Sequence, residues 1–320
     1  MDFVKNIIGK ELSTFEKKFE DAVRSNTPML DRILRYIIKR KGKQMRPMFV
    51  FLSAKLVGEI NESTYRAAAL VELLHTATLV HDDVVDESME RRGFFSINAI
   101  WKNKIAVLVG DYLLSKGLLL STSNEDFMHL HILSEAVKQM SEGELLQIEK
   151  SRKLNLDEEV YFEIIRNKTA SLLSSACAVG AYSTGKDETK TEKMKLFGQK
   201  VGIAFQIKDD LFDYGKEDVG KPTGNDIREK KLTLPLIYTL NNIDKNARRK
   251  IIYMLKNENK NKESINFIIE SVIKAGGIKY AETKMNLYRD EALEILYTFD
   301  ASPVRSALEE LVRFTTDRKY

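Results

Sequence analysis

Two clusters of aspartate are the residues whose types and spacing most directly indicate chemistry. They share the spacing D-D-x-x-D and consist of Asp82, Asp83, Asp86 and of Asp209, Asp210, Asp213. We expect each cluster to end a helix, which places its first and last carboxylates on one face, four residues apart. Like charges at that spacing destabilise a helix, and the negative end of the helix dipole adds to the cost. Bound Mg²⁺ would offset both effects, because it prefers oxygen ligands and is commonly shared between carboxylates and substrate phosphates.

A single acidic cluster at a helix end is more often solvated than metal-binding, so one copy would be a weak signal. The second copy strengthens it, because each cluster follows a strongly apolar stretch, ALVELLHTATLVH and LFGQKVGIAFQIK. Helix ends of this kind are attached to the core. If the two ends face each other, six carboxylates line one cleft, which suits several Mg²⁺ ions and a polyanionic ligand.

Basic residues recur along the chain and, together with two metal clusters, would supply countercharge to two phosphorylated substrates. They are Lys43, Arg46, Arg91, Arg92, Lys168, Lys221, Arg228, Lys230 and Lys231. Each of them alone would be an ordinary surface charge. Together they match the needs of diphosphates, which arginine binds through forked hydrogen bonds and lysine as a point charge.

The elements that must position these residues are helices. The chain has 320 residues, 43% of them hydrophobic and 31% charged, and no proline lies between Pro47 and Pro222. That spacing excludes a turn-dense all-β fold. Helical periodicity predicts helices at residues 2–24, 29–40, 47–57, 61–86, 95–122, 126–152, 157–184, 189–214, 233–242, 245–256, 262–274, 278–298 and 302–317. We predict an all-α fold in a single domain, residues 1–320.

One segment, residues 215–231, interrupts this helical pattern with three glycines and a proline. Composition alone favours a solvated surface loop. Its lysines and its place after the second cluster favour a lid over a bound diphosphate, since long loops in compact domains are often functional.

Charge and cysteine content set limits on partners and compartment. Fifty-one basic and 47 acidic residues leave a net charge of +4, which does not argue for nucleic acid. The single cysteine, Cys177, cannot form an internal disulfide, and this fits a cytoplasmic setting. The first residues carry charges throughout, so we expect no signal peptide, and we expect no transmembrane segment.

Five stretches together give the chain a family resemblance. They are GKQMRP (42–47), HTATLVHDDVVDESMERRG (75–93), VLVGD (107–111), Lys168-Thr169, and FQIKDDLFDYGKEDVGKPTGND (205–226), followed by LTLP (232–235). In these the chain resembles the trans-isoprenyl diphosphate synthases, or polyprenyl synthetases, and is most similar to long-chain members. One departure is Lys230, which stands where relatives usually have glycine.

The resemblance implies about a dozen helices around a central cavity, a homodimer, and three Mg²⁺ ions. It implies head-to-tail 1'-4 condensation of isopentenyl diphosphate with an allylic diphosphate. The six aspartates would bind Mg²⁺. The allylic diphosphate would contact Arg91, Lys168 and Lys231, with Lys221 nearby. Isopentenyl diphosphate would contact Lys43, Arg46, His75 and Arg92. Thr169 and Gln206 would direct oxygen dipoles at the developing allylic cation.

Product length is predicted from the helix that carries the first cluster. In relatives with short products a bulky aromatic residue four or five positions before the cluster closes the tunnel. Here those positions are Thr78 and Ala77, with Leu74 one turn further. We therefore predict a long-chain product of about six to eight isoprene units, as in quinone side chains. The alternative is that Ala77 only serves helix packing.

Other functions compete with this one. A synthase of farnesyl or geranylgeranyl diphosphate would differ only in product length. A class I terpene cyclase shares the fold and the first motif but has a mixed second metal motif, unlike the second D-D-x-x-D here. A non-catalytic subunit would lose carboxylates or arginines that this chain retains. Glu72 and His75 form an E-x-x-H, as in di-iron bundles, but no second copy is present. His81 is predicted to be a structural neighbour of the first cluster.

Overall fold

The computed structural model describes residues 2–39, 42, 44–91, 93–153, 157–215 and 223–317. Its helices are α1 (Asp2–Val23), α2 (Pro28–Ile38), α3 (Met45–Val57), α4 (Glu62–Val85), α5 (Ile97–Thr122), α6 (Phe127–Lys153), α7 (Glu158–Ile165), α8 (Ser171–Gly185), α9 (Glu188–Phe212), α10 (Asn225–Arg228), α11 (Leu234–Asn242), α12 (Lys245–Asn257), α13 (Lys262–Lys274), α14 (Gly277–Leu296) and α15 (Pro303–Asp317). The predicted all-α class is confirmed. Lys43, Arg92, Lys221 and the rest of residues 216–222 of the predicted lid lie outside the described residues, and Arg91 is described for its backbone only.

Three local features differ from the sequence prediction. Two paired strands, β1 (Glu90–Arg91) and β2 (Phe94–Phe95), precede α5. Each has two residues, which is too short for an alternating sequence pattern to predict it. The helix predicted over 157–184 is divided by a π-helical turn, Arg166–Ala170. Part of the predicted 215–231 loop folds as α10, a single turn that begins after Gly224 in the left-handed region at φ 78°.

The described chain divides into two compact units. The first contains residues 1–137, 175–195 and 301–308, and the second contains residues 138–174, 196–300 and 309–320. The first aspartate cluster belongs to the first unit, and the second cluster belongs to the second unit. The single-domain assignment of residues 1–320 stays a prediction.

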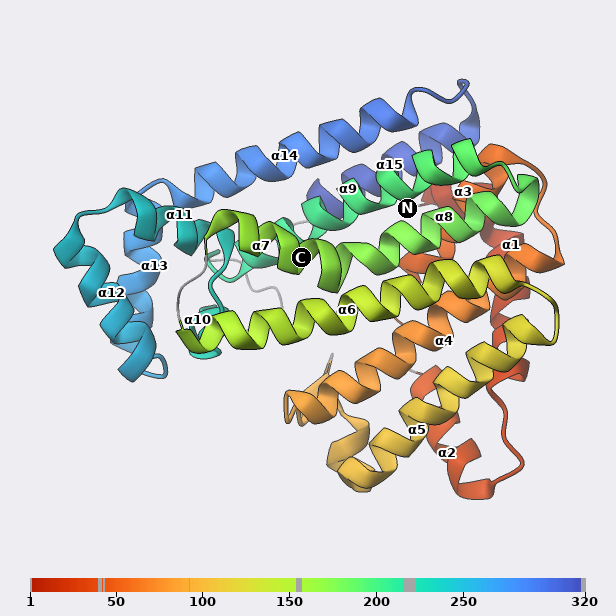
Figure 1. Cartoon of the computed structure of the whole chain (residues 1–320), viewed down its shortest axis with the longest axis horizontal. Helices are drawn as coiled ribbons and strands as arrows, with labels where there is room; N and C mark the ends of the chain where they lie inside the picture. The colour runs from red at the N-terminus through yellow and green to blue at the C-terminus, as the bar shows by residue number, and fades with distance from the viewer. Residues whose placement is uncertain are drawn as a thin grey trace. The chain divides into compact units, whose positions relative to one another are not determined.

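In the first unit, α4 packs against α1, α3 and α5, and it lies side by side with α5 (Figure 1). Asn61 begins α4 as predicted, through a capping box in which its side chain accepts the Thr64 N–H at 3.2 Å and the Thr64 hydroxyl accepts the Asn61 N–H at 3.3 Å. Apolar side chains between α4 and α5 are buried, among them Leu73, Val80 and Leu113. This packing fixes the axis of α4, and with it the direction of the first cluster.

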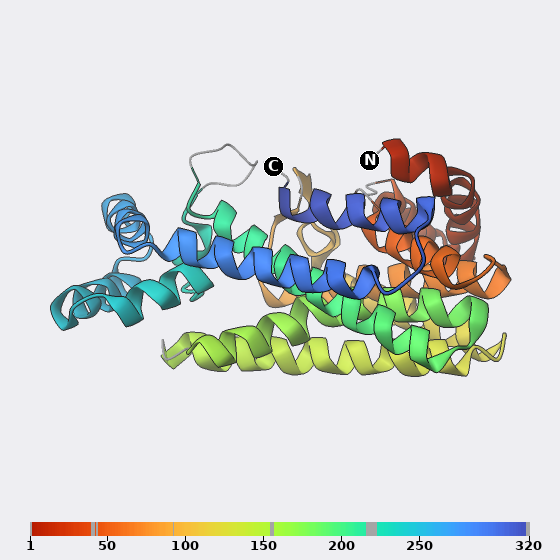
Figure 2. The ribbon, with the colours of Figure 1, turned by 90° about the horizontal axis from the view of Figure 1, so that it is seen from above.

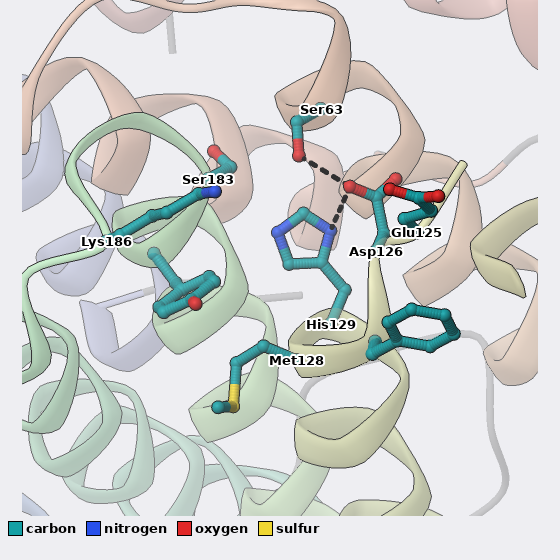
Figure 3. A pocket seen from close by; sticks show the side chains of 9 residues that line it. Ser63, Glu125, Asp126, Met128, His129, Ser183 and Lys186 are labelled. Carbon is teal, nitrogen blue, oxygen red and sulfur yellow. Dashed lines mark hydrogen bonds and ion pairs between the residues drawn. The ribbon is translucent and has the colours of Figure 1, made fainter.

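A polar cluster joins the N-terminal ends of α4 and α6 in the first unit (Figure 3). The Ser63 hydroxyl donates to Asp126 at 3.0 Å, as Figure 3 shows. The Arg66 guanidinium donates to both carboxylate oxygens of Asp126, at 2.5 and 3.2 Å. His129, only 2% exposed, holds Nδ1 3.8 Å from Asp126 and packs edge-on against Tyr182 of α8. Ser63, Asp126, His129 and Tyr182 are among the residues that line a cavity of about 80 Å³. The cluster therefore ties three helix ends together.

In the second unit, α11 contacts α7, α13 and α14, and α12 packs against α13. Figure 2 shows α12 and α13 beside the first turns of α14. Gly277 allows α14 to approach α11 closely, because a Cβ there would lie 2.4 Å from the Pro235 carbonyl oxygen. Tyr280 of α14 stacks on Tyr238 of α11 at 4.2 Å and donates its hydroxyl to Glu158 at 2.8 Å. These contacts hold α7 in place, and the π-helical turn that follows α7 carries two of the predicted site residues.

Candidate active site

Asp210, in the last turn of α9, is the most enclosed carboxylate of the second cluster. It is 5% exposed, and both of its carboxylate oxygens accept hydrogen bonds from protein groups. The Gln206 amide donates at 2.9 Å and the Tyr161 hydroxyl donates at 2.7 Å. Burial raises the pKa of Asp210 well above its usual range, and the Asp226 carboxylate raises it further. Asp210 is thus held on both sides, while Asp209 beside it is half-buried.

Asp213 binds the chain that returns after the predicted lid. Its side chain accepts the backbone N–H groups of Asn225 at 2.7 Å and Asp226 at 3.1 Å, and its carbonyl accepts the Gly224 N–H at 3.0 Å. Burial raises the pKa of Asp213, although these backbone hydrogen bonds oppose that rise. The contact fastens the start of α10 to the end of α9 and brings Asp226 close to the cluster.

Lys168 and Thr169 both lie in the π-helical turn Arg166–Ala170. The Thr169 hydroxyl donates to the Gln206 side-chain oxygen at 2.8 Å, and Lys168 forms an ion pair with Glu144 of α6. Short π-helical turns occur frequently at functional sites, because the extra residue redirects neighbouring side chains. Hydrogen bonds therefore connect Thr169 through Gln206 to Asp210.

Two glycines bring neighbouring helices against this turn. A Cβ at Gly202 of α9 would lie 2.6 Å from the Ala170 Cα, and a Cβ at Gly143 of α6 would lie 2.9 Å from the Lys168 backbone nitrogen. Real Cβ atoms do not approach backbone this closely. Glycine at both positions is therefore required for α6 and α9 to pack on the turn.

The first cluster ends α4 with three carboxylates in different surroundings. Asp83 is 5% exposed, whereas Asp82 is half-buried and Asp86 is exposed. The Asp83 carbonyl accepts the Asn98 side-chain amide at 3.1 Å and the Ser88 N–H at 2.9 Å. These bonds connect the end of α4 to the start of α5. Asp82 and Asp86, four residues apart, are the more accessible pair.

His81 contacts α5, in agreement with a structural role. Its Nε2 lies 3.2 Å from the Val107 carbonyl oxygen and 3.6 Å from an Asp111 carboxylate oxygen. A Cβ at Gly110 would lie 2.1 Å from that nitrogen, so glycine leaves the space that the ring occupies. The VLVGD stretch is therefore explained by packing at His81.

The predicted basic residues are distributed over several elements. Arg46 is half-buried in the first turn of α3, and His75 is half-buried on α4. Lys231 forms an ion pair with Glu229 at 2.5 Å, and its backbone N–H bonds the Asp226 carbonyl at 2.8 Å. These contacts hold Lys231 next to α10, whose first residues bind Asp213 of the second cluster.

The residues predicted to set product length lie on the buried side of α4. Ala77 is fully buried in the apolar cluster between α4 and α5, and Leu74 is 6% exposed. A Cβ at Gly117 of α5 would lie 3.8 Å from a Leu74 methyl. Thr78 is half-buried and donates its hydroxyl to the His75 carbonyl at 2.9 Å. The control of product length by these residues stays a prediction.

Several residues of the site were not predicted from the sequence. Tyr161 lies in an apolar helical stretch and Glu144 on a charged helix face, so neither carried a signal. Asp226 belongs to the quoted motif, but its position beside Asp210 and Asp213 depends on the fold. Gly143 and Gly202 were not predicted either, because their role depends on the backbone that packs against them.

The donor set suits magnesium that is shared with a substrate. In the described part of the chain, no group of three or more histidine, cysteine, aspartate or glutamate side chains is arranged to hold a metal ion alone. Mg²⁺ is commonly bound by one or two carboxylates together with phosphate oxygens. The accessible carboxylates, Asp82 and Asp86 of the first cluster and Asp209 of the second, therefore fit an ion that arrives with a diphosphate.

Comparisons with known proteins give one consistent result. The profile of the family described as polyprenyl synthetase matches residues 27–272. The heptaprenyl diphosphate synthase component 2 of Bacillus subtilis is 33% identical over 98% of this chain and 90% of its own length. The octaprenyl diphosphate synthase of Escherichia coli is 30% identical over 99% of both chains.

Solved structures agree with the sequence comparisons. A polyprenyl synthase from Caulobacter crescentus, complexed with calcium and isoprenyl diphosphate, superposes with a TM-score of 0.92 at 34% identity, covering 100% of this chain and 98% of that chain. A geranylgeranyl pyrophosphate synthase from Bacteroides thetaiotaomicron gives a TM-score of 0.85 at 37% identity, covering 99% of this chain and 98% of that chain.

Proposed function

The chain belongs to the polyprenyl synthetase family, and from this premise we propose that it extends an allylic diphosphate with isopentenyl diphosphate, in Mg²⁺-dependent 1'-4 steps, to an all-trans polyprenyl diphosphate. It is a prenyltransferase, as its named relatives are. The observation that carries the proposal is the hydrogen-bonded series Thr169–Gln206–Asp210–Tyr161 beside Asp209.

We assign different roles to the aspartates. Asp82, Asp86 and Asp209 are the carboxylates that would hold Mg²⁺ with the allylic diphosphate, and three ions remain the expectation from the family. Bound Mg²⁺ would neutralise the charge that develops on the departing diphosphate. Asp83, Asp210 and Asp213 would keep the two helix ends in position, which their burial and hydrogen bonds support.

The chain's own residues would stabilise the allylic cation and bind the diphosphates. The side-chain oxygens of Thr169 and Gln206 are 2.8 Å apart and are held before reaction begins. Preorganised dipoles stabilise a developing charge without reorganisation during the step. Lys168 and Lys231, with Arg91 and Lys221, would bind the allylic diphosphate, and Lys43, Arg46, His75 and Arg92 would bind isopentenyl diphosphate.

A long-chain product is favoured by the small side chains Ala77 and Thr78 and by relatives named heptaprenyl and octaprenyl diphosphate synthases. The 37% identity to a geranylgeranyl pyrophosphate synthase favours a shorter product as the second candidate. Incubation with farnesyl diphosphate and labelled isopentenyl diphosphate, followed by chromatography of the dephosphorylated products, separates the two. A main product of four isoprene units would overturn the long-chain assignment.

The metal assignment is tested by Asp209→Asn with Glu192→Gln as the control on the same helix. Loss of one metal-binding carboxylate should lower elongation about 1,000-fold, because metal neutralisation of a leaving group is worth several kcal/mol. The control should retain wild-type turnover. Wild-type activity of the Asp209→Asn protein would refute the role given to this carboxylate.

The exposed side of α5 supports a homodimer. Val107, Leu108, Leu118 and Leu119 are between 41% and 60% exposed, and their spacing places them on one face of the part of α5 that follows the break at Lys102. By length and composition α5 could also cross a membrane, although one third of its most apolar window is buried. We propose that a second copy covers this face and that the enzyme works in the cytoplasm. Light scattering should give twice the mass of 36.7 kDa, and a monomer would contradict the dimer.

A further inference from the structure

The helix α12 and the turn that follows it concentrate positive charge. Residues 244–263 contain seven basic side chains and three acidic ones, a net charge of +4. The whole chain also has a net charge of +4. All other residues together are therefore balanced, and the excess charge of the protein lies in this one segment.

The spacing of these residues places most of the charge on a single face, which we call the basic face. It is formed by Lys245, Arg248, Arg249, Tyr253 and Lys256, which recur every three or four residues. All five are exposed, and Tyr253 is 58% exposed. The helix buries its other side through Ile251 and Leu255. The basic face is about 20 Å long, since the helix has 13 residues.

Among the described residues, Lys245, Arg248, Arg249 and Lys256 form no ion pair, although other exposed lysines do, such as Lys274 with Glu270. Like charges four residues apart, as at Lys245 and Arg249, destabilise a helix. Fold stability therefore does not explain the arrangement, whereas an anionic partner surface would offset the repulsion.

The basic face is exposed in the described part of the second unit. The helix packs on α13, and both views show it beside α13 at the end of the unit (Figures 1 and 2). The exposed Tyr253 lies between the cations, whereas the half-buried Ile252 packs against the apolar core of the second unit. The apolar side of α12 is used for packing within the protein, so the basic face is the side that is left for a partner.

We propose that the basic face docks the enzyme on an anionic lipid surface. The choice of lipid rests on the proposed function, because a long polyprenyl diphosphate has an apolar tail that water does not accept. A surface cluster of lysine and arginine is attracted to anionic lipid headgroups. Tyr253 suits the headgroup region, since its ring is apolar and its hydroxyl is polar. Nucleic acid offers phosphates too, but the apolar tail of the proposed product gives a reason for a lipid surface and none for nucleic acid.

The test is co-sedimentation of the full chain with vesicles of phosphatidylcholine, with and without phosphatidylglycerol. The test variant combines Lys245→Gln, Arg248→Gln, Arg249→Gln and Lys256→Gln. The control variant removes the same charge elsewhere, through Lys5→Gln, Lys10→Gln, Lys17→Gln and Lys279→Gln. Each basic residue near an anionic surface contributes about fivefold in affinity, so the test variant should bind several hundredfold more weakly.

The control variant should bind anionic vesicles like the wild type, and salt at about 0.5 M should release both. Equal loss in both variants, or unchanged binding of the test variant, would overturn the proposal. So would binding of a single-stranded oligonucleotide that the test variant loses while neither protein binds vesicles. The assay contains no substrate, and the first condensation on a short soluble primer should be unchanged in the test variant. Failure of docking is thus distinguishable from failure of the proposed function.

Discussion

Replacing Gly202 by alanine should disturb the candidate site through backbone packing alone. The new Cβ would lie 2.6 Å from the Ala170 Cα and 2.7 Å from its Cβ. Carbon atoms in ordinary contact lie about 3.5–4.0 Å apart, so α9 must move by about 1 Å. The neighbour is backbone and cannot rotate away. The Thr169–Gln206 hydrogen bond, 2.8 Å long, would then exceed the usual range of hydrogen-bond lengths.

Two opposing effects determine how Gly202→Ala changes the free energy of unfolding. Overpacking in a tight interior costs about 1–3 kcal/mol. Alanine in place of glycine within a helix returns about 0.5–1 kcal/mol. We therefore expect a net loss of about 1–2 kcal/mol, measured by urea unfolding followed by circular dichroism. Turnover should fall on the order of 100-fold, because displacing a positioned group by about 1 Å costs that much.

Gly9→Ala is the matched control, because a Cβ at Gly9 of α1 meets nothing within 4 Å. That variant should gain about 0.5–1 kcal/mol and keep its turnover. If the Gly202→Ala protein unfolds at the same urea concentration as the wild type, the packing argument is refuted, whatever the reaction. If stability falls but turnover does not, the orientation of Gln206 has no catalytic importance.

Three further predictions follow from other parts of the chain. Ala77→Phe should shorten the main product in the elongation assay, and an unchanged product would show that Ala77 serves only packing. Burial lowers the pKa of His129, although the Asp126 carboxylate opposes this. The contribution of His129 to the free energy of unfolding is therefore complete above pH 6.5 and is lost as the pH falls through the lowered pKa. His129→Gln should flatten the decrease in urea stability from pH 7.5 to 5, and an equal decrease in the variant and the wild type would contradict this. Burial raises the pKa of the Cys177 thiol to about 12, so a thiol reagent at pH 8 should modify it only in denaturant, and fast labelling of the native protein would disprove its burial.

Much of the secondary structure could be predicted from the sequence. Apolar residues at helical spacing gave nearly all helices, and Asn61 marked the start of α4 because capping depends on residues three apart. The π-helical turn at Arg166–Ala170 was missed, since its sequence continues the helical period and only the packing of Gly143 and Gly202 against it distinguishes it. The strands β1 and β2 were not predicted because two residues are too few for an alternating pattern.

By itself the sequence determined the spacing of both aspartate clusters, the helices that end in them, and the family. Within a cluster, however, the residues are chemically identical, and only the tertiary structure assigned them different surroundings. Asp210 is enclosed because Tyr161, 49 residues earlier, donates to it, and Asp213 is enclosed because it caps the turn of α10. Helix formation follows from local periodicity, whereas burial and hydrogen-bond partners depend on contacts between distant segments. For this reason the spacing identified six carboxylates, and the fold distinguished those that support the site from those that are accessible.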